Sequence, residues 1–322
     1  MPQITITQLA LIVILVVTCT IASFSTDHNS RAIRSRIAEG QSRLALLRKE
    51  KGRHGSEVIE AEKSLSKLVE EMSRIEQFSY LPKLRGGESL SAKLRSSLPY
   101  IIGITIGVIV GAIVIMLIPI ILIVILFILA TFVGSSGLFS EFVRSQNRAF
   151  ALSAIPAGLY ALTQVFVLLQ LYDIFYLVFW VFDIVVVLTL IGVSMIFGKE
   201  LQLEIVIILV AILAAWDIYA VIFSNVMGAN ISKLAYTLFS VLIPNGNGFS
   251  LIGGGDFFFS CLLVTSFTRR LKAVPVALVF LIGASVTALI FAMAITGQTM
   301  APALPAVLAA GLFSAIYYRR KL

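Results

Sequence analysis

Charged side chains are scarce in this sequence: Asp, Glu, Lys and Arg make up 13% of the 322 residues, whereas 59% are hydrophobic. A soluble globular domain carries about 25% charged residues. Several apolar runs exceed the roughly 20 residues that a helix needs to cross a bilayer. Because backbone polar groups in lipid must be hydrogen-bonded within their own segment, the sequence predicts an all-α polytopic membrane protein.

Cysteine and histidine, the usual ligands of zinc, are also few, with two of each. Cys19 and Cys261 lie in apolar stretches, and His28 and His54 lie in a polar segment. None has a partner at the spacing of a zinc site, so we expect packing roles for the cysteines and no metal. The net charge of +8 would suggest a nucleic-acid partner for a soluble protein. Beside membrane spans it reports topology instead, and we expect no nucleic acid.

Basic residues are also absent before the first apolar stretch, where a cleaved signal peptide would carry them. The positive charges follow this stretch, at Arg31, Arg34 and Arg36. Residues 1–25 are therefore predicted to be a retained transmembrane anchor with its N-terminus outside the cell.

Residues 26–97 are the one long polar segment, with 15 basic and 10 acidic side chains. Hydrophobic positions recur at helical spacing on both sides of a Lys-Gly-Arg-His-Gly turn. This pattern predicts a soluble, basic helical hairpin on the cytoplasmic side. It is interpreted either as a coil that binds a protein partner or as a passive spacer.

The apolar stretch at residues 99–133 would make a helix about 52 Å long, well beyond a hydrocarbon core of roughly 30 Å. We therefore predict that residues 98–149 hold two short spans, turning near Pro119, and a connection. Further spans are expected at about 150–171, 175–197, 203–223, 250–267, 273–295 and 301–318. With nine spans in total, the basic clusters and the C-terminus fall on the cytoplasmic side.

Acidic residues inside a span are costly and usually functional. Glu204 begins a helix, where the helix dipole favours a carboxylate, and Asp183 is placed to bond a neighbouring helix. Asp217 and Asp256 differ because they match in depth. Asp217 lies about six residues before the end of its span, and Asp256 about six residues after the start of the next. The two helices run antiparallel, so both residues are expected about 9 Å from the same membrane face.

Two carboxylates that meet in a medium of low dielectric share one proton and titrate as a unit. Such a pair can hydrolyse a peptide bond: one Asp takes a proton from water while the other donates a proton to the carbonyl. Asp217 and Asp256 are therefore the candidate catalytic residues.

Two further motifs lie near this pair. Three glycines, residues 253–255, precede Asp256 and allow close approach of a substrate or of a neighbouring helix. The last span opens with Pro302-Ala303-Leu304-Pro305. Proline is tolerated in the first turn of a helix, but two prolines also hold an extended segment whose carbonyls are available to a substrate strand.

In this order and spacing, the motifs resemble those of the presenilin and signal peptide peptidase family, the GxGD intramembrane aspartyl proteases, in a compact prokaryotic (archaeal-type) form. The matching residues are Trp216 and Asp217 in one span, Gly253, Gly254, Gly255 and Asp256 in the next, and Pro302, Ala303 and Leu304 in the last. The resemblance covers residues 150–322, the predicted catalytic core.

The resemblance implies a nine-span fold that cleaves single-span transmembrane proteins or signal peptide remnants within the bilayer, without a metal or organic cofactor. It implies catalytic roles for Asp217 and Asp256 and an active site shaped by Gly253, Gly255, Trp216, Pro302, Ala303 and Leu304. Trp216 departs from the Tyr usual before the first Asp. The connection at residues 224–249 lacks the long autoproteolytic loop of presenilins and is expected to act as a gate or an added strand.

Two other classes of function stay open. Asp217 and Asp256 could bind a proton or cation in a transporter or channel, although inverted repeats are not evident. The chain could also be an inactive scaffold whose hairpin binds partners. Prepilin peptidases also use GxGD, but their first Asp is expected much earlier in the chain.

Overall fold

The structure is a computed structural model that describes residues 6–51, 56–77, 119–143, 145–219, 240–245, 248–296 and 302–319, with a few residues between 99 and 107. This part of the chain is helical apart from one two-stranded sheet. Three of its helices are long and apolar enough to span a membrane: α4 (Ile120–Phe142), α5 (Gln146–Leu168) and α6 (Tyr172–Glu200). The chain is therefore an all-helical membrane protein in its main features. The count of nine spans stays a prediction.

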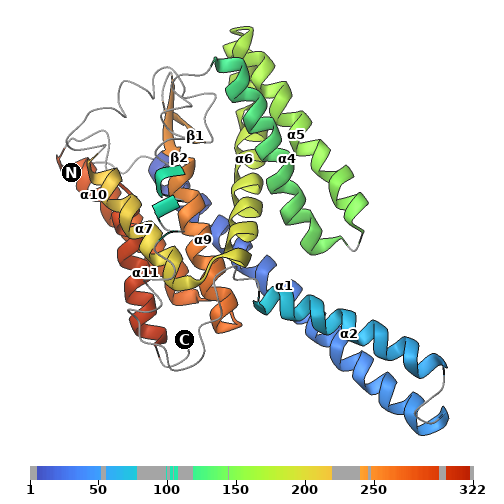
Figure 1. Ribbon diagram of the computed structural model, residues 1–322. Coiled ribbons are helices and arrows are strands. Elements are labelled where there is room, and N and C mark those ends of the chain that lie inside the picture. Colours follow the sequence, from blue (N-terminus) through green and yellow to red (C-terminus); the bar gives the residue numbers. More distant parts are fainter. Residues whose placement is uncertain are drawn as a thin grey trace.

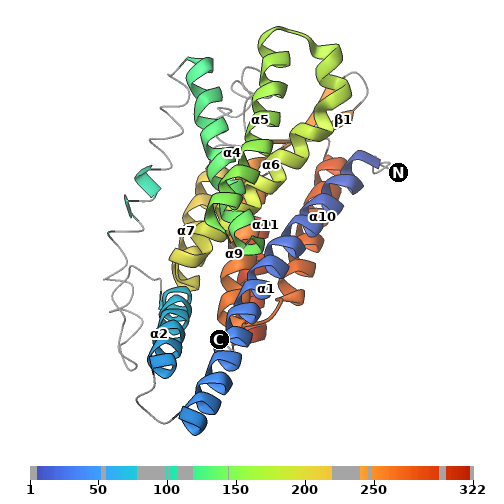
Figure 2. The same ribbon diagram turned by 90° about the vertical axis from the view of Figure 1, so that its right-hand side faces the viewer.

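Helix α1 (Ile6–Lys51) runs without a break for 46 residues (Figure 2). The boundary predicted between the anchor and the polar hairpin lies inside this helix, because a change from apolar to polar side chains does not interrupt backbone hydrogen bonding. Helix α2 (Ser56–Gln77) folds back along the second half of α1 (Figure 1). Arg48 and Glu62 form a salt bridge of 2.6 Å between the two arms.

Pro119 is the N-cap residue of α4, so the second of the two predicted short spans begins directly after it. The segment before Pro119 in the predicted turn lies outside the described residues. The predicted end of the second span at Val133 is wrong, because α4 continues to Phe142. The Gly-Ser-Ser-Gly sequence after Val133 signals a turn in a soluble protein, but in a membrane bundle small residues bring helices together. Most of the first short span predicted at residues 99–118 lies outside the described residues.

Helices α4, α5 and α6 pack together as one group (Figure 1). The α4–α6 crossing is very close: a Cβ atom added at Gly192 would lie 1.7 Å from the carbonyl oxygen of Gly134. A Cβ at Gly134 would lie 2.7 Å from the carbonyl oxygen of Thr189. The backbones of the two helices are therefore in direct contact, and only glycine fits at this crossing.

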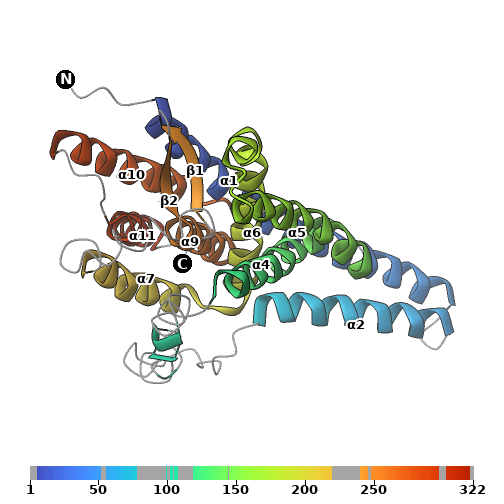
Figure 3. The ribbon, with the colours of Figure 1, turned by 90° about the horizontal axis from the view of Figure 1, so that it is seen from above.

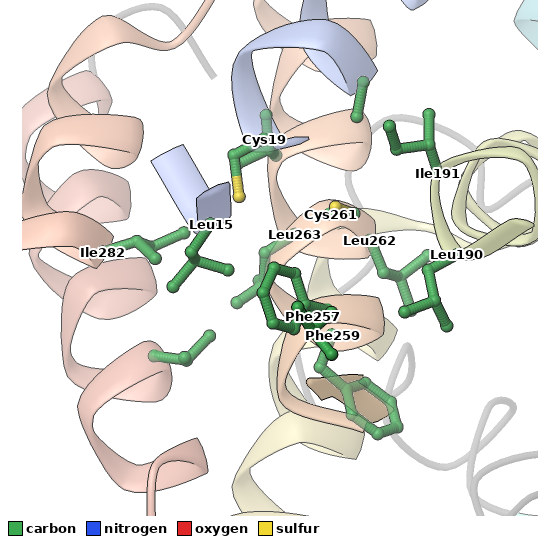
Figure 4. Packing of buried hydrophobic residues seen from close by; sticks show 14 of the residues in the cluster. Leu15, Cys19, Leu190, Ile191, Phe257, Phe259, Cys261, Leu262, Leu263 and Ile282 are labelled. Carbon is green, nitrogen blue, oxygen red and sulfur yellow. The ribbon is translucent and has the colours of Figure 1, made fainter. Parts of the chain in front are cut away.

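A second group consists of α7 (Leu203–Ile218), α9 (Gly254–Leu271), α10 (Val276–Thr296) and α11 (Leu304–Tyr318). Helix α9 is its centre and contacts α1, α6, α7 and α11 (Figure 3). Residues 259–268 of α9 are all buried, so neighbouring elements cover this helix on every side. Phe257, Cys261 and Leu262 are fully buried, and Cys261 lies across from Cys19 of α1 as a free thiol (Figure 4).

Strands β1 (Ser240–Asn245) and β2 (Gly248–Gly253) form an antiparallel hairpin that leads directly into α9. The span predicted from residue 250 therefore starts too early, since residues 250–253 belong to β2. A short apolar run bounded by glycines is equally compatible with strand and helix, and here pairing with β1 decides for the strand.

Candidate functional site

Asp217 lies in the last turn of α7, where this helix meets the start of α11. The Leu304 backbone N–H donates to Asp217 Oδ2 over 3.2 Å, and the Ala303 backbone N–H faces the same carboxylate. The first N–H groups of a helix have no partner within the helix. Ala303, the N-cap residue of α11, provides no side-chain cap, so Asp217 of another helix takes that role. The Pro-Ala-Leu motif and the first candidate aspartate are thus in direct contact.

Asp256 lies in the first turn of α9, a position that favours a carboxylate near the positive end of the helix dipole. Gly253 is the N-cap residue, and a Cβ added there would lie 3.4 Å from Asp256 Oδ2. A Cβ added at Gly255 would meet nothing within 4 Å. The two glycines therefore differ: a side chain at position 253 would touch the carboxylate, whereas position 255 borders open space.

The two aspartates come from helices that pack against each other, α7 and α9 (Figure 3). Asp217 and Asp256 are both half-buried. They are close enough for a direct electrostatic interaction between their carboxyl groups. The structure thus brings together Asp217, Asp256 and the start of α11, three elements that are separated by about 40 residues or more along the sequence.

The remaining predicted site residues occupy the edges of this arrangement. Leu304 is buried in the core cluster, while Pro302 and Ala303 are half-buried. The Trp216 side chain is 42% exposed, and its ring centroid lies 5.7 Å from that of Tyr219. Trp216 therefore faces outward from α7 beside Tyr219. The predicted gate falls mostly on residues 220–239, which lie outside the described residues.

A further contact was not foreseen. The buried Asp183 of α6 accepts a hydrogen bond of 2.8 Å from the Leu242 backbone N–H of β1. The partner predicted from the sequence, a neighbouring helix, is therefore wrong. The sequence carried a signal for the strand, because Gly-Asn between two strand-like runs is typical of a β-hairpin and occurs at residues 246–247.

Within the described residues, no group of three or more His, Cys, Asp and Glu side chains is arranged to hold a metal ion. No protein-family model matches the chain, and a search of curated proteins finds no match.

Proposed function

We propose that this protein is an intramembrane aspartyl endopeptidase that hydrolyses peptide bonds within single-span transmembrane segments or signal peptide remnants. The observation that carries the proposal is that Asp217 and Asp256 lie on the packed helices α7 and α9, near enough for their carboxyl groups to interact electrostatically, with the start of α11 hydrogen-bonded to Asp217. A carboxyl pair of this kind is suited to general acid and general base catalysis.

In the proposed reaction, one carboxylate takes a proton from water, and the resulting oxygen attacks the scissile carbonyl carbon. The other carboxyl group donates its proton to the carbonyl oxygen. When the tetrahedral intermediate collapses, the C–N bond breaks and the amine nitrogen receives a proton from the pair. The Leu304 N–H donates to Oδ2 of Asp217 and so orients that carboxylate at the start of α11.

A substrate helix must unwind before this reaction, because helical hydrogen bonds and packing shield its carbonyls. An extended peptide can add to the edge of a sheet through its main chain. Strand β2 ends at Gly253, three residues before Asp256, and Gly255 borders open space. These features support binding of an unwound substrate segment alongside β2.

The same proposal includes a nine-span topology in a prokaryotic cell membrane. The N-terminus lies outside, and the hairpin at residues 26–97 and the C-terminus lie in the cytoplasm, where the hairpin is available to a protein partner. The basic residues near the ends of the spans support this orientation.

Binding of a transition-state analogue tests the proposed activity. A peptide that carries a hydroxyethylene group in place of the scissile bond presents a hydroxyl to the carboxyl pair. We expect it to bind the purified protein in nanodiscs, and to bind at least tenfold more weakly to the Asp256→Asn variant. Equal binding to both proteins would contradict the proposal, and cation-dependent uptake into liposomes that is unaffected by the analogue would favour a transporter.

A further inference from the structure

Asp183 is an acidic residue buried in the interior of an apolar helix, with only 6% of its surface exposed. A buried carboxylate is costly unless it is hydrogen-bonded. Asp183 Oδ1 accepts a hydrogen bond of 2.8 Å from the backbone N–H of the fully buried Leu242, 59 residues further along the chain. This bond ties α6 to β1, the first strand of the hairpin that leads into α9.

The direction of this bond shows which edge of the hairpin faces α6. Leu242 lies opposite Leu251 in the register of the two strands. Because its N–H donates to Asp183, it points away from β2, and the Leu242–Leu251 pair is of the non-hydrogen-bonded kind. Strand β1 contacts α6 and α1 on this side, as seen from above in Figure 3.

Backbone orientation repeats every second residue along a strand, so position 244 faces the same edge as position 242. That position is Pro244, which has no N–H to donate. The outer edge of β1 therefore has two interior positions: the N–H at Leu242 is bound by Asp183, and Pro244 has no N–H. Occupied or missing donors prevent an edge strand from pairing with another chain.

The other edge of the hairpin belongs to β2. The residues opposite Pro244, Leu242 and Ser240 are Phe249, Leu251 and Gly253. In non-hydrogen-bonded pairs both partners direct their N–H and C=O groups outward. The outward groups of β2 therefore form a row that ends three residues before Asp256.

We propose that Asp183 is a positioning residue of the proposed protease. It fixes β1 against α6, closes the outer edge of β1 to added strands, and holds β2 and the start of α9 in place. An extended substrate is thereby restricted to the β2 edge, in line with Asp256. The attachment of β1 to α6 is inferred from the hydrogen bond alone. Its effect on where substrate is cleaved rests on the proposed function.

Hydrogen–deuterium exchange tests the anchoring without any assay of activity. Asp183→Leu removes the acceptor at similar volume, whereas Asp183→Asn keeps an oxygen at the same position. We expect exchange in residues 240–253 to be roughly tenfold faster or more in Asp183→Leu and close to wild type in Asp183→Asn, because the oxygen that accepts from the Leu242 N–H is lost only in the first. Equal exchange in Asp183→Leu and wild type would overturn the anchoring.

Cleavage products test the positioning. We expect Asp183→Leu to lower kcat by roughly tenfold or more and to spread cleavage over several bonds, with Asp183→Asn restoring the wild-type pattern. If Asp183→Leu does not fold, Leu242→Pro is the second variant. It removes the N–H donor instead of the acceptor, on the same edge of β1 where Pro244 already has no N–H. It should reproduce both the lower kcat and the spread of cleavage sites. If exchange in residues 240–253 is faster in Asp183→Leu but its kcat and cleavage products are unchanged, the positioning role is overturned. A wild-type protein that cleaves nothing overturns the proposed function and the catalytic half of this inference, while exchange still decides the anchoring.

Discussion

The Leu304 backbone N–H lies 3.2 Å from Oδ2 of Asp217, although the two residues are 87 positions apart in the sequence. This contact gives Asp217 a structural role besides its proposed chemical one, because its carboxylate caps α11. The two roles can be separated by substitution, since an amide oxygen can still accept the hydrogen bond but cannot act as a general base.

Asp217→Asn is therefore expected to keep the fold. The side-chain oxygen of Asn still accepts from the Leu304 N–H, so the free energy of unfolding should stay within about 0.5 kcal/mol of wild type. Asp217→Ala removes the cap and should cost about 1 kcal/mol. Thermal unfolding of both variants in the same detergent measures this difference. Equal stability of Asp217→Ala and wild type would show that Asp217 does not cap α11.

Gly192→Ala is expected to disrupt the crossing of α4 and α6. Its Cβ would lie 1.7 Å from a carbonyl oxygen of Gly134, so the two helices must separate, at a cost of about 3 kcal/mol or more. Gly158→Ala is the matched control, because a Cβ there meets nothing within 4 Å. It should leave stability unchanged or raise it by up to about 1 kcal/mol. Comparable loss of stability in both variants, measured by thermal unfolding, would contradict this packing.

The glycines before Asp256 should respond differently to the same change. Gly253→Ala brings a methyl group 3.4 Å from the Asp256 carboxylate and is expected to lower kcat. Gly255→Leu extends into the open space beside that position and is expected to raise KM by roughly tenfold while the protein stays folded. Steady-state cleavage of one substrate by the two variants separates these effects. An unchanged KM for Gly255→Leu would mean that substrate does not occupy this space.

Arg269 should stabilise the contact between α9 and α6. Its guanidinium donates to the Gly198 carbonyl oxygen near the end of α6, where the helix dipole favours a cation. Arg269→Ala is expected to cost about 1.5–3 kcal/mol. Arg269→Lys keeps the charge and should recover part of this loss. Thermal unfolding checks the order of the three proteins, and equal stability of Arg269→Ala and wild type would rule out this role.

Apolar runs of suitable length predicted α5, α6, α10 and α11 because membrane helices are specified by local composition. The placement of Asp217 and Asp256 on the packed helices α7 and α9 agrees with a match in depth along antiparallel helices, which was predicted from their positions in the spans. The strand at residues 248–253 was missed because a short apolar run does not distinguish strand from buried helix. The partner of Asp183 was also missed, since that contact depends on how the hairpin lies against α6.

The most direct test of the account is cleavage of single-span substrates by purified protein in liposomes, with product masses as the readout. Wild type is compared with Asp217→Asn, Asp256→Asn and, as a matched control at an exposed aspartate of α6, Asp173→Asn. We predict cuts inside the hydrophobic segment by wild type and Asp173→Asn and a loss of at least about 1,000-fold in the other two variants. Cleavage that survives in either Asp217→Asn or Asp256→Asn, or no cleavage by folded wild-type protein, would contradict the catalytic pair.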